Sequence, residues 1–170
     1  GDVYKRQHIY SFFAPLGSVG GGFIVFEGID NCGKTTHARL LTEWLERRGV
    51  RPLLVSFPTK STPLGRLARG VLDGSISLGG KAEALLFIAD MVDYFEREVL
   101  PAMKAGSTVV CDRYFYSTMV YQQARGKCGM EYVREICKSL PAPDIVIVVD
   151  VPVEVALARA ARRKKKDRFD

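Results

Sequence analysis

Residues 23–36, Phe-Ile-Val-Phe-Glu-Gly-Ile-Asp-Asn-Cys-Gly-Lys-Thr-Thr, join an apolar run to a glycine-containing loop. From Gly28 to Thr35 they match the pattern G-x-x-x-x-G-K-[ST] in full. The apolar run predicts a buried strand, and the apolar residues after Thr35 recur at helical spacing. The loop therefore has the strand-to-helix context that the pattern requires, and we interpret it as a phosphate-binding loop.

Each part of this loop has a physical role in binding a nucleoside triphosphate. Glycines let backbone N–H groups curl around a phosphate, and the N-terminus of the following helix adds about half a positive charge. Lys34 supplies a mobile charge to the β- and γ-phosphates, and Thr35 offers a hydroxyl to Mg²⁺. The predicted cofactors are therefore ATP and Mg²⁺. The loop residues predicted to bind the nucleotide are Gly28, Asp30, Asn31, Cys32, Gly33, Lys34, Thr35 and Thr36.

Outward from the loop, apolar strands alternate with amphipathic helices. Strands are expected at residues 23–26, 53–57, 108–111 and 145–149, and helices from 35, at 62–72, 81–99, 115–125 and 129–139, and from 152. The strands are continuously apolar, which is typical of a parallel sheet covered on both faces. We predict a three-layer α/β/α fold of the P-loop NTPase class, with four visible parallel strands and a fifth missing. Its ligands should bind at the carboxyl ends of the strands.

Length and composition agree with one globular domain. The 170 residues are 47% apolar and 26% charged, and no apolar run approaches the roughly 20 residues that span a bilayer. The four cysteines form no C-x-x-C pair, so neither a zinc site nor a disulfide framework is predicted. We interpret them as reduced thiols of a cytoplasmic protein without a membrane partner.

The two ends of the chain do not fit the domain pattern. Residues 1–21 show no useful periodicity, and we interpret them as a disordered or artefactual extension of a domain at 22–170. The net charge of +6 is concentrated after Arg159, where the chain ends inside a basic run. Such a run is read as a solvated tail, a nucleic-acid patch or a site for a small polyanion. The domain is expected to be incomplete at its C-terminus.

Several further motifs, in their order and spacing, resemble those of the thymidylate kinase family. The matching stretches are 23–36, Phe57-Pro58, Leu85-Leu86-Phe87-Ile88-Ala89-Asp90, Cys111-Asp112-Arg113-Tyr114 with Ser117, Tyr121 and Gln122, Pro143-Asp144, Arg159, and Asp167-Arg168-Phe169. The resemblance implies a P-loop nucleoside-monophosphate kinase that transfers a phosphoryl group from Mg-ATP to a small nucleotide, with dTMP as the expected acceptor and dTDP as the product. It also implies a homodimer, for which helix 81–99 offers an apolar face.

Phosphoryl transfer brings two polyanions together, and the enzyme must neutralise both and hold them in line. Lys34 serves the donor, and Asp112 is suited to hold Mg²⁺ with Thr35, the alternative being an N-cap carboxylate. Arg113 is suited to form a bidentate pair with the acceptor phosphate, the alternative being a surface salt bridge. The predicted catalytic residues are Lys34, Asp112, Arg113, Arg163 and Arg168.

The family resemblance implies the remaining contacts. Phe87 would stack on the acceptor base, although periodicity alone places it in the core, and Arg159 would lie over the adenine. The basic run would become a lid from about residue 160, with Arg163 and Arg168 closing on the transferred group. The predicted substrate contacts are Asp30, Phe57, Lys60, Phe87, Met91, Arg113, Ser117, Tyr121 and Gln122.

Three positions depart from the family pattern. Met91 stands where most members carry an arginine that helps to read thymine, and it shares a helix face with Phe87. Lys60 replaces a phosphate-binding arginine, and Asn31 stands where some members place a catalytic arginine. Because of Met91, a kinase for another deoxynucleotide or a nucleoside is an alternative interpretation. Because of the C-terminal end, a non-catalytic ATP-binding domain is a second alternative. No nucleic-acid partner is expected, because the basic run lacks interleaved aromatic residues.

Overall fold

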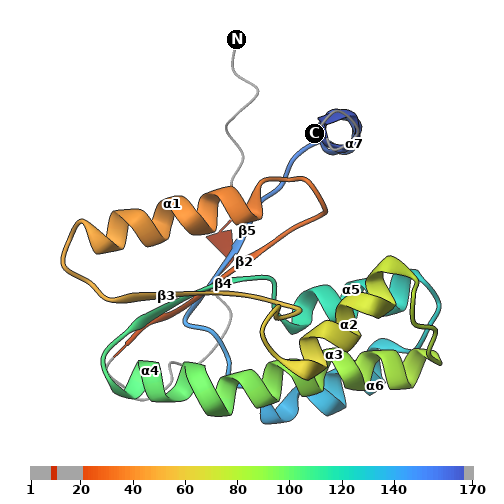
Figure 1. The fold of residues 1–170 in the computed structure, drawn as a ribbon, viewed down its shortest axis with the longest axis horizontal. Coiled ribbons are helices and arrows are strands. Elements are labelled where there is room, and N and C mark those ends of the chain that lie inside the picture. Colours follow the sequence, from red (N-terminus) through yellow and green to blue (C-terminus); the bar gives the residue numbers. More distant parts are fainter. Residues whose placement is uncertain (1–8, 11–20, 167–170) are drawn as a thin grey trace.

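A five-stranded sheet forms the middle layer of the fold (Figure 1). Its spatial order is β1 (Ile9–Tyr10), β5 (Ile145–Val148), β2 (Phe23–Glu27), β4 (Thr108–Asp112) and β3 (Pro52–Ser56). Strands β5, β2, β4 and β3 run parallel, which confirms the predicted sheet, and each strand end lies within one residue of its prediction. The structure is a computed structural model that describes residues 9–10 and 21–166, with side chains described for residues 21–162.

The short strand β1 pairs antiparallel with β5 at the edge of the sheet. It comes from the stretch 1–21, for which the sequence predicts no element. Backbone N–H and C=O groups at a sheet edge can pair with any extended segment, so this pairing needs no side-chain periodicity. The other residues of this stretch up to residue 20 lie outside the described part of the chain, and their interpretation as an extension stays a prediction.

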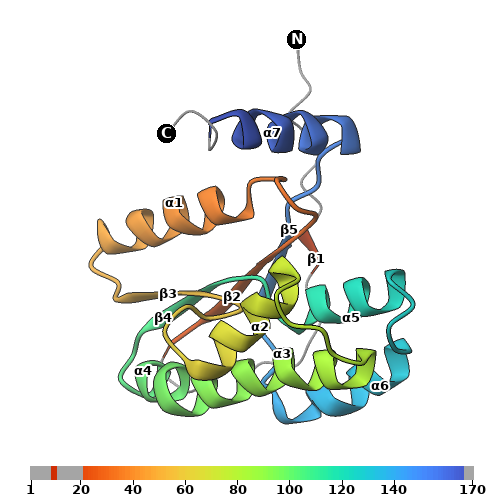
Figure 2. The same cartoon turned by 45° about the vertical axis from the view of Figure 1, so that its right-hand side comes forward.

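Helices cover both faces of the sheet, as predicted. On one face lies α1 (Lys34–Glu46); on the other lie α3 (Gly80–Tyr94), α4 (Leu100–Lys104) and α6 (Met130–Ile136) (Figures 1 and 2). α2 (Pro63–Asp73) and α5 (Phe115–Ala124) stand on that second side near the carboxyl ends of the strands, and α7 (Val153–Lys166) lies beyond the start of α1. A π-helical turn (Phe95–Val99) joins α3 to α4, and a 3₁₀ turn (Cys137–Ser139) follows α6.

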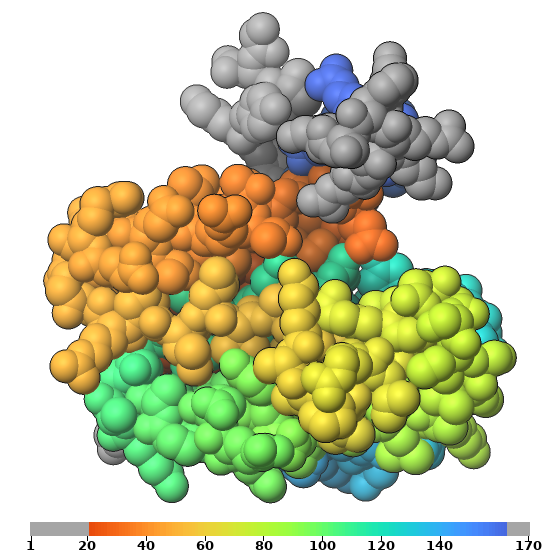
Figure 3. Space-filling model, in the orientation of Figure 1, coloured from red at the N-terminus to blue at the C-terminus, as the bar shows by residue number. Residues whose placement is uncertain are grey.

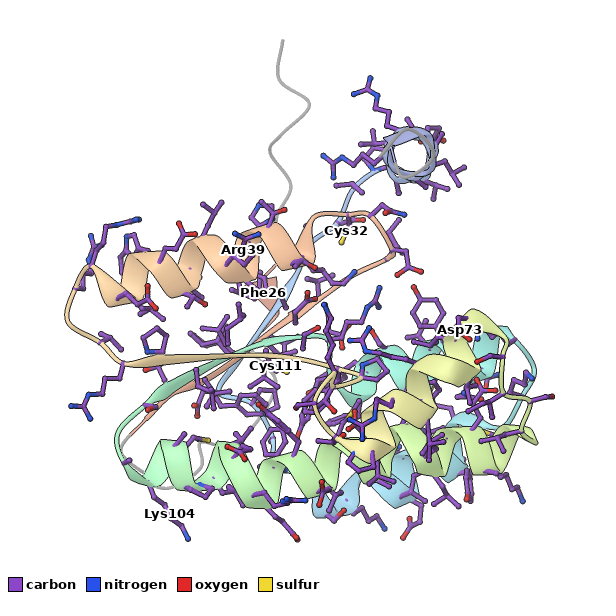
Figure 4. All side chains as sticks on the ribbon, in the orientation of Figure 1. Phe26, Cys32, Arg39, Asp73, Lys104 and Cys111 are labelled. Carbon is purple, nitrogen blue, oxygen red and sulfur yellow. The ribbon has the colours of Figure 1, made fainter. Side chains whose placement is uncertain are left out.

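The core has two parts, one on each face of the sheet. Phe26 points toward α1 and packs with Ala38, whereas Cys111 points to the opposite face, toward α3 (Figure 4). Phe23 lies on that second face, fully buried, with ring centroids 5.2 Å from both Phe95 and Tyr114. These contacts anchor the start of β2, the strand that leads into the phosphate-binding loop.

Local signals predicted the start of α2 but not the buried face of α3. Thr62 caps α2 by accepting a hydrogen bond from the N–H of Gly65 at 2.8 Å, and Pro63 occupies the first turn. In α3 the residues turned inward include Ala84, Ile88 and Met91, whereas Leu85 is 48% exposed. The apolar spacing of residues 81–99 predicts that Leu85 shares one side of the helix with Ile88, Val92 and Phe95. This prediction is wrong for Leu85, because a shift of one residue, from Ala84 to Leu85, turns the side chain by about 100° around the helix.

Candidate functional site

A cavity of about 840 Å³ opens at the carboxyl ends of the strands. Figure 3 shows this hollow between the start of α1 and helix α2, with atoms of the β4–α5 region at its floor. The predicted site residues that line it are Asp30, Asn31, Cys32, Gly33, Lys34, Thr35, Thr36, Phe57, Phe87, Met91, Asp112, Arg113, Ser117, Tyr121, Gln122 and Arg159. Segments far apart in the sequence therefore meet at one site, and the individual roles of these residues stay predictions.

The phosphate-binding loop holds a buried positive charge. The ammonium Nζ of Lys34 donates to the carbonyl of Ile29 at 2.6 Å and lies 3.6 Å from Cys32 Sγ, and Lys34 is only 5% exposed. Gly28 has a φ of 141°, and a Cβ there would lie 2.4 Å from the carbonyl oxygen of Val149. This close approach requires glycine at the base of the loop. Gly28 does not itself line the cavity, and its contribution is to let the loop turn there.

Thr35 and Asp112 bring two oxygen donors together beside the loop. Thr35 Oγ1 donates to Asp112 Oδ2 at 2.5 Å, and Asp112 is buried at the end of β4. The residue that caps α5 is Tyr114, so Asp112 is not the N-cap carboxylate of the alternative interpretation. A hydroxyl and a carboxylate beside a phosphate site fit Mg²⁺, which prefers oxygen ligands.

Few side chains are available to hold that ion. In residues 9–10 and 21–166 no three or more His, Cys, Asp or Glu side chains form a group that could bind a metal. Mg²⁺ usually keeps several waters and takes phosphate oxygens, so it needs only one or two protein ligands. The oxygens of Thr35 and Asp112 are therefore enough for a Mg²⁺ ion whose other ligands are phosphate oxygens and water.

Arg113 projects into the cavity from an unusual backbone position. Its φ is 72°, in the left-handed region that favours glycine. Its Nη1 donates to Ser117 Oγ at 2.9 Å, its Nη2 forms an ion pair with Asp30, and its guanidinium lies 5.6 Å from the ring centroid of Tyr121. The salt bridge of the alternative interpretation therefore exists, but it lies inside the cavity, where both partners face the space for a substrate.

Glu27 holds this turn, and the sequence analysis did not select it as a site residue. One carboxylate oxygen accepts the N–H groups of Tyr114 at 2.9 Å and Ser117 at 3.2 Å, and the other accepts Ser117 Oγ at 2.7 Å. Burial raises the pKa of Glu27, while these hydrogen bonds and the charge of Arg113 oppose the rise. A signal was present in the sequence, since an acidic residue that ends a buried central strand lies where ligands bind.

The deepest wall of the cavity comes from α3 and α5. Phe87 and Met91, both buried, line it from one face of α3, as their spacing predicted. Gln122 is 1% exposed, and its Nε2 donates to Glu83 Oε1 at 2.9 Å. Because a carboxylate accepts only, this contact fixes which way the Gln122 amide points.

The cavity also contains residues that the sequence analysis missed. These are chiefly His37, Arg69, Glu83, Thr118 and Arg125. Glu83 is 2% exposed and has two cations nearby, Arg125 Nη1 at 3.8 Å and Lys127 Nζ at 3.6 Å. A glutamate among the apolar residues of a predicted helix was the available signal, but nothing in the sequence placed it beside Gln122.

Lys60 is not among the residues that line the cavity, and its predicted contact with substrate stays a prediction. It is exposed, because the preceding Thr59 is anchored inward by Asp90, whose Oδ2 accepts the Thr59 N–H at 2.7 Å. The cation found at this side of the cavity is Arg69 of α2, which donates to the carbonyl groups of Pro58 and Thr59. A guanidinium from another element therefore lines this side of the cavity, and the sequence analysis did not select it.

The remaining predicted contacts are those of Arg159, Cys32, Arg163 and Arg168. Arg159 Nη1 donates to the loop carbonyls of Asn31 at 3.2 Å and Cys32 at 2.9 Å, so it contacts the loop directly. Cys32 lines the cavity but is only 1% exposed. The side chain of Arg163 and all of Arg168 lie outside the described residues, so the predicted lid stays a prediction.

Two observations on the described residues also bear on the sequence predictions. All four cysteines are free, as predicted. Across residues 9–10 and 21–166, no helix combines the length and the apolar character needed to cross a bilayer.

Comparisons with known proteins agree with this site. The family model for thymidylate kinase matches residues 26–170. A probable thymidylate kinase of Pyrococcus abyssi is 43% identical over 156 residues, covering 88% of this chain and 75% of the relative. A thymidylate kinase of Bradyrhizobium sp. (strain ORS 278) is 38% identical over 157 residues, covering 88% and 70%.

A solved structure supports the same assignment. The crystal structure of thymidylate kinase from Ehrlichia chaffeensis superposes with a TM-score of 0.69 at 32% identity, covering 82% of this chain and 78% of that one. The parallel sheet, the loop between β2 and α1 and the match along residues 26–170 therefore agree with the resemblance seen in the sequence, and the chain belongs to the thymidylate kinase family.

Proposed function

We propose that this chain transfers the γ-phosphoryl group of ATP to dTMP, giving ADP and dTDP. The observation that carries the proposal is a single cavity with the phosphate-binding loop on one side and Arg113 and Phe87 on the other. An oxygen of the dTMP phosphate bonds to the γ-phosphorus. The bond between that phosphorus and the oxygen bridging to ADP breaks.

The residues of the loop serve the donor. Lys34 exchanges its contact with the Ile29 carbonyl for oxygens of the β- and γ-phosphates, so its charge is already at the reaction centre. Thr35 and Asp112 would hold Mg²⁺, which neutralises charge on the phosphates when it is bound. Burial of Lys34 strengthens its attraction to phosphate, because little water screens it.

The opposite wall serves the acceptor. Arg113 binds the dTMP phosphate with a planar, permanently charged group, and Asp30, with which it pairs in this structure, is released toward the sugar. Phe87 supplies a face on which the base stacks. Gln122, oriented by Glu83, supplies polar contact to the base edge, since Met91 cannot donate a hydrogen bond.

A coupled ADP-release assay tests the proposal. The protein is offered Mg-ATP with each nucleoside monophosphate and each deoxynucleoside monophosphate in turn. ADP release is expected with dTMP, and it should fall to background when EDTA exceeds Mg²⁺. Release with another acceptor alone would keep the phosphoryl-transfer mechanism and change the substrate specificity. Silence with every acceptor, in a protein that still binds ATP, would contradict the proposal and favour a non-catalytic ATP-binding domain.

The proposed assembly is a homodimer that works in the cytoplasm, where ATP is abundant and thiols stay reduced. Leu85 and Ala89 lie one turn apart on α3 and are both exposed, and Leu67 of the neighbouring α2 is 47% exposed. Covering such apolar side chains favours association. Sedimentation velocity at micromolar protein is expected to give twice the mass of one chain. A single species at 18.9 kDa would contradict the dimer.

A further inference from the structure

Glu27 links the two halves of the cavity. Its backbone is the last residue of β2, directly before Gly28 and the phosphate-binding loop. Its carbonyl accepts the N–H of Val149 at 2.8 Å on the β5 side, and the preceding residue, Phe26, pairs with β4. The donor loop therefore starts from a fixed point.

The side chain of Glu27 reaches the acceptor side. Its carboxylate accepts three hydrogen bonds from the turn that begins α5, two from backbone N–H groups and one from Ser117 Oγ. Ser117 Oγ in turn accepts Arg113 Nη1 at 2.9 Å. A chain of contacts therefore runs from the donor loop through Glu27 and Ser117 to the guanidinium of Arg113.

The backbone of Arg113 needs such support. A φ of 72° is unfavourable in a residue with a side chain and persists only where the surroundings over-determine it. The N–H of Arg113 donates to the Phe26 carbonyl at 3.0 Å, and Glu27 holds the N–H of the next residue, Tyr114. Adjacent residues of β2 thus hold adjacent residues of the strained turn.

We propose that Glu27 is a positioning residue that sets the distance and angle between the phosphate-binding loop and Arg113. The inference rests on the proposed function, in which Arg113 binds the acceptor phosphate. In-line transfer depends on the spacing of the two phosphates, and a misplacement of about 1 Å can cost about 10²-fold in rate. Glu27 acts on that spacing without touching either nucleotide.

Glu27→Gln tests the role with a minimal change of shape. The amide keeps one acceptor for the backbone N–H groups but replaces the acceptor of Ser117 Oγ by a donor, so Ser117 loses the bond that orients its hydroxyl toward Arg113. kcat/KM for dTMP is expected to fall roughly 10- to 100-fold, and the dTMP Kd from titration calorimetry should rise. The ATP Kd should change by less than about twofold, because the loop keeps its own contacts. Glu135→Gln, an exposed change on α6, is the matched control and should match the wild type.

A double variant distinguishes a positioning role of Glu27 from a general loss of structure. In an Arg113→Ala protein, adding Glu27→Gln should lower kcat/KM by less than about threefold further, since the group that it positions is gone. Full additivity, or a dTMP affinity equal to that of the wild type, would overturn the inference. Should Glu27→Gln fail to fold, Ser117→Ala cuts the same link and should also raise the dTMP Kd; an unchanged value there overturns the inference as well.

Failure of the proposed function gives a different result. A wild-type protein that binds ATP and dTMP but releases no ADP overturns phosphoryl transfer alone, and the calorimetric comparison then decides the role of Glu27. A wild-type protein that does not bind dTMP overturns both.

Discussion

Lys34→Ala is expected to lower kcat/KM for ATP-dependent phosphoryl transfer by about 10²- to 10³-fold, the range for removing one preorganised group that stabilises transition-state charge. The ammonium is buried inside the loop, at 2.6 Å from the Ile29 carbonyl, so it is already oriented where the phosphates would bind. Initial rates of ADP release at varied ATP, with dTMP saturating, measure the change.

Two further variants make the Lys34 result specific. Lys34→Arg should remain strongly impaired, because a planar fork does not fit a loop shaped around one compact ammonium. Lys104→Ala removes an exposed lysine at the end of α4, remote from the cavity (Figure 4), and should keep wild-type activity. Retention of more than about a third of wild-type kcat/KM in Lys34→Ala would contradict the assigned role. Each tenfold loss in kcat/KM corresponds to about 1.4 kcal/mol of transition-state stabilisation, so a loss of about threefold or less would leave Lys34 with only a small share.

Phe23→Ala is expected to destabilise the fold by about 3–5 kcal/mol, the range for truncating a buried phenylalanine. Phe23 is fully buried at the start of β2, and its ring meets Phe95 and Tyr114 edge-on at 5.2 Å. The truncation leaves a void between the central strand and the helices of that face. Urea unfolding followed by circular dichroism measures the loss as a lower midpoint with an unchanged slope.

An exposed apolar residue serves as the control for this prediction. Leu40 of α1 is 53% exposed, and Leu40→Ala should change the free energy of unfolding by no more than about 0.5 kcal/mol. A loss below about 1 kcal/mol in Phe23→Ala would mean that the core on this face relaxes into the void, against the packing seen around Phe95 and Tyr114.

The contacts of Glu27 and the exposure of Lys60 could not be predicted from the sequence. Glu27 was visible at the end of a strand, but its partners Tyr114 and Ser117 lie 87 and 90 residues away. Lys60 was selected by its place after Phe57-Pro58, yet Asp90 of another helix anchors Thr59 and leaves Lys60 exposed. Hydrogen bonds between distant segments decide such side-chain directions, and local periodicity carries no information about them.

The sequence by itself determined the donor side of this protein. The loop 28–35 is contiguous, so the close turn at Gly28, the N-terminus of α1 and the charge of Lys34 follow from local chemistry. The four parallel strands followed as well, because a strand buried on both faces must be apolar along its length.

Only the tertiary structure decided the acceptor side. Phe87 and Met91 come from α3, Arg113 from the end of β4, and Gln122 from α5, and they face one cavity because the core around Phe23, Phe95 and Tyr114 packs these elements together. The link from Glu27 through Ser117 to Arg113 has the same origin. Contacts between segments far apart in the chain form only once burial has fixed the packing of the sheet and its helices, and that packing depends on shape complementarity that a linear pattern does not encode.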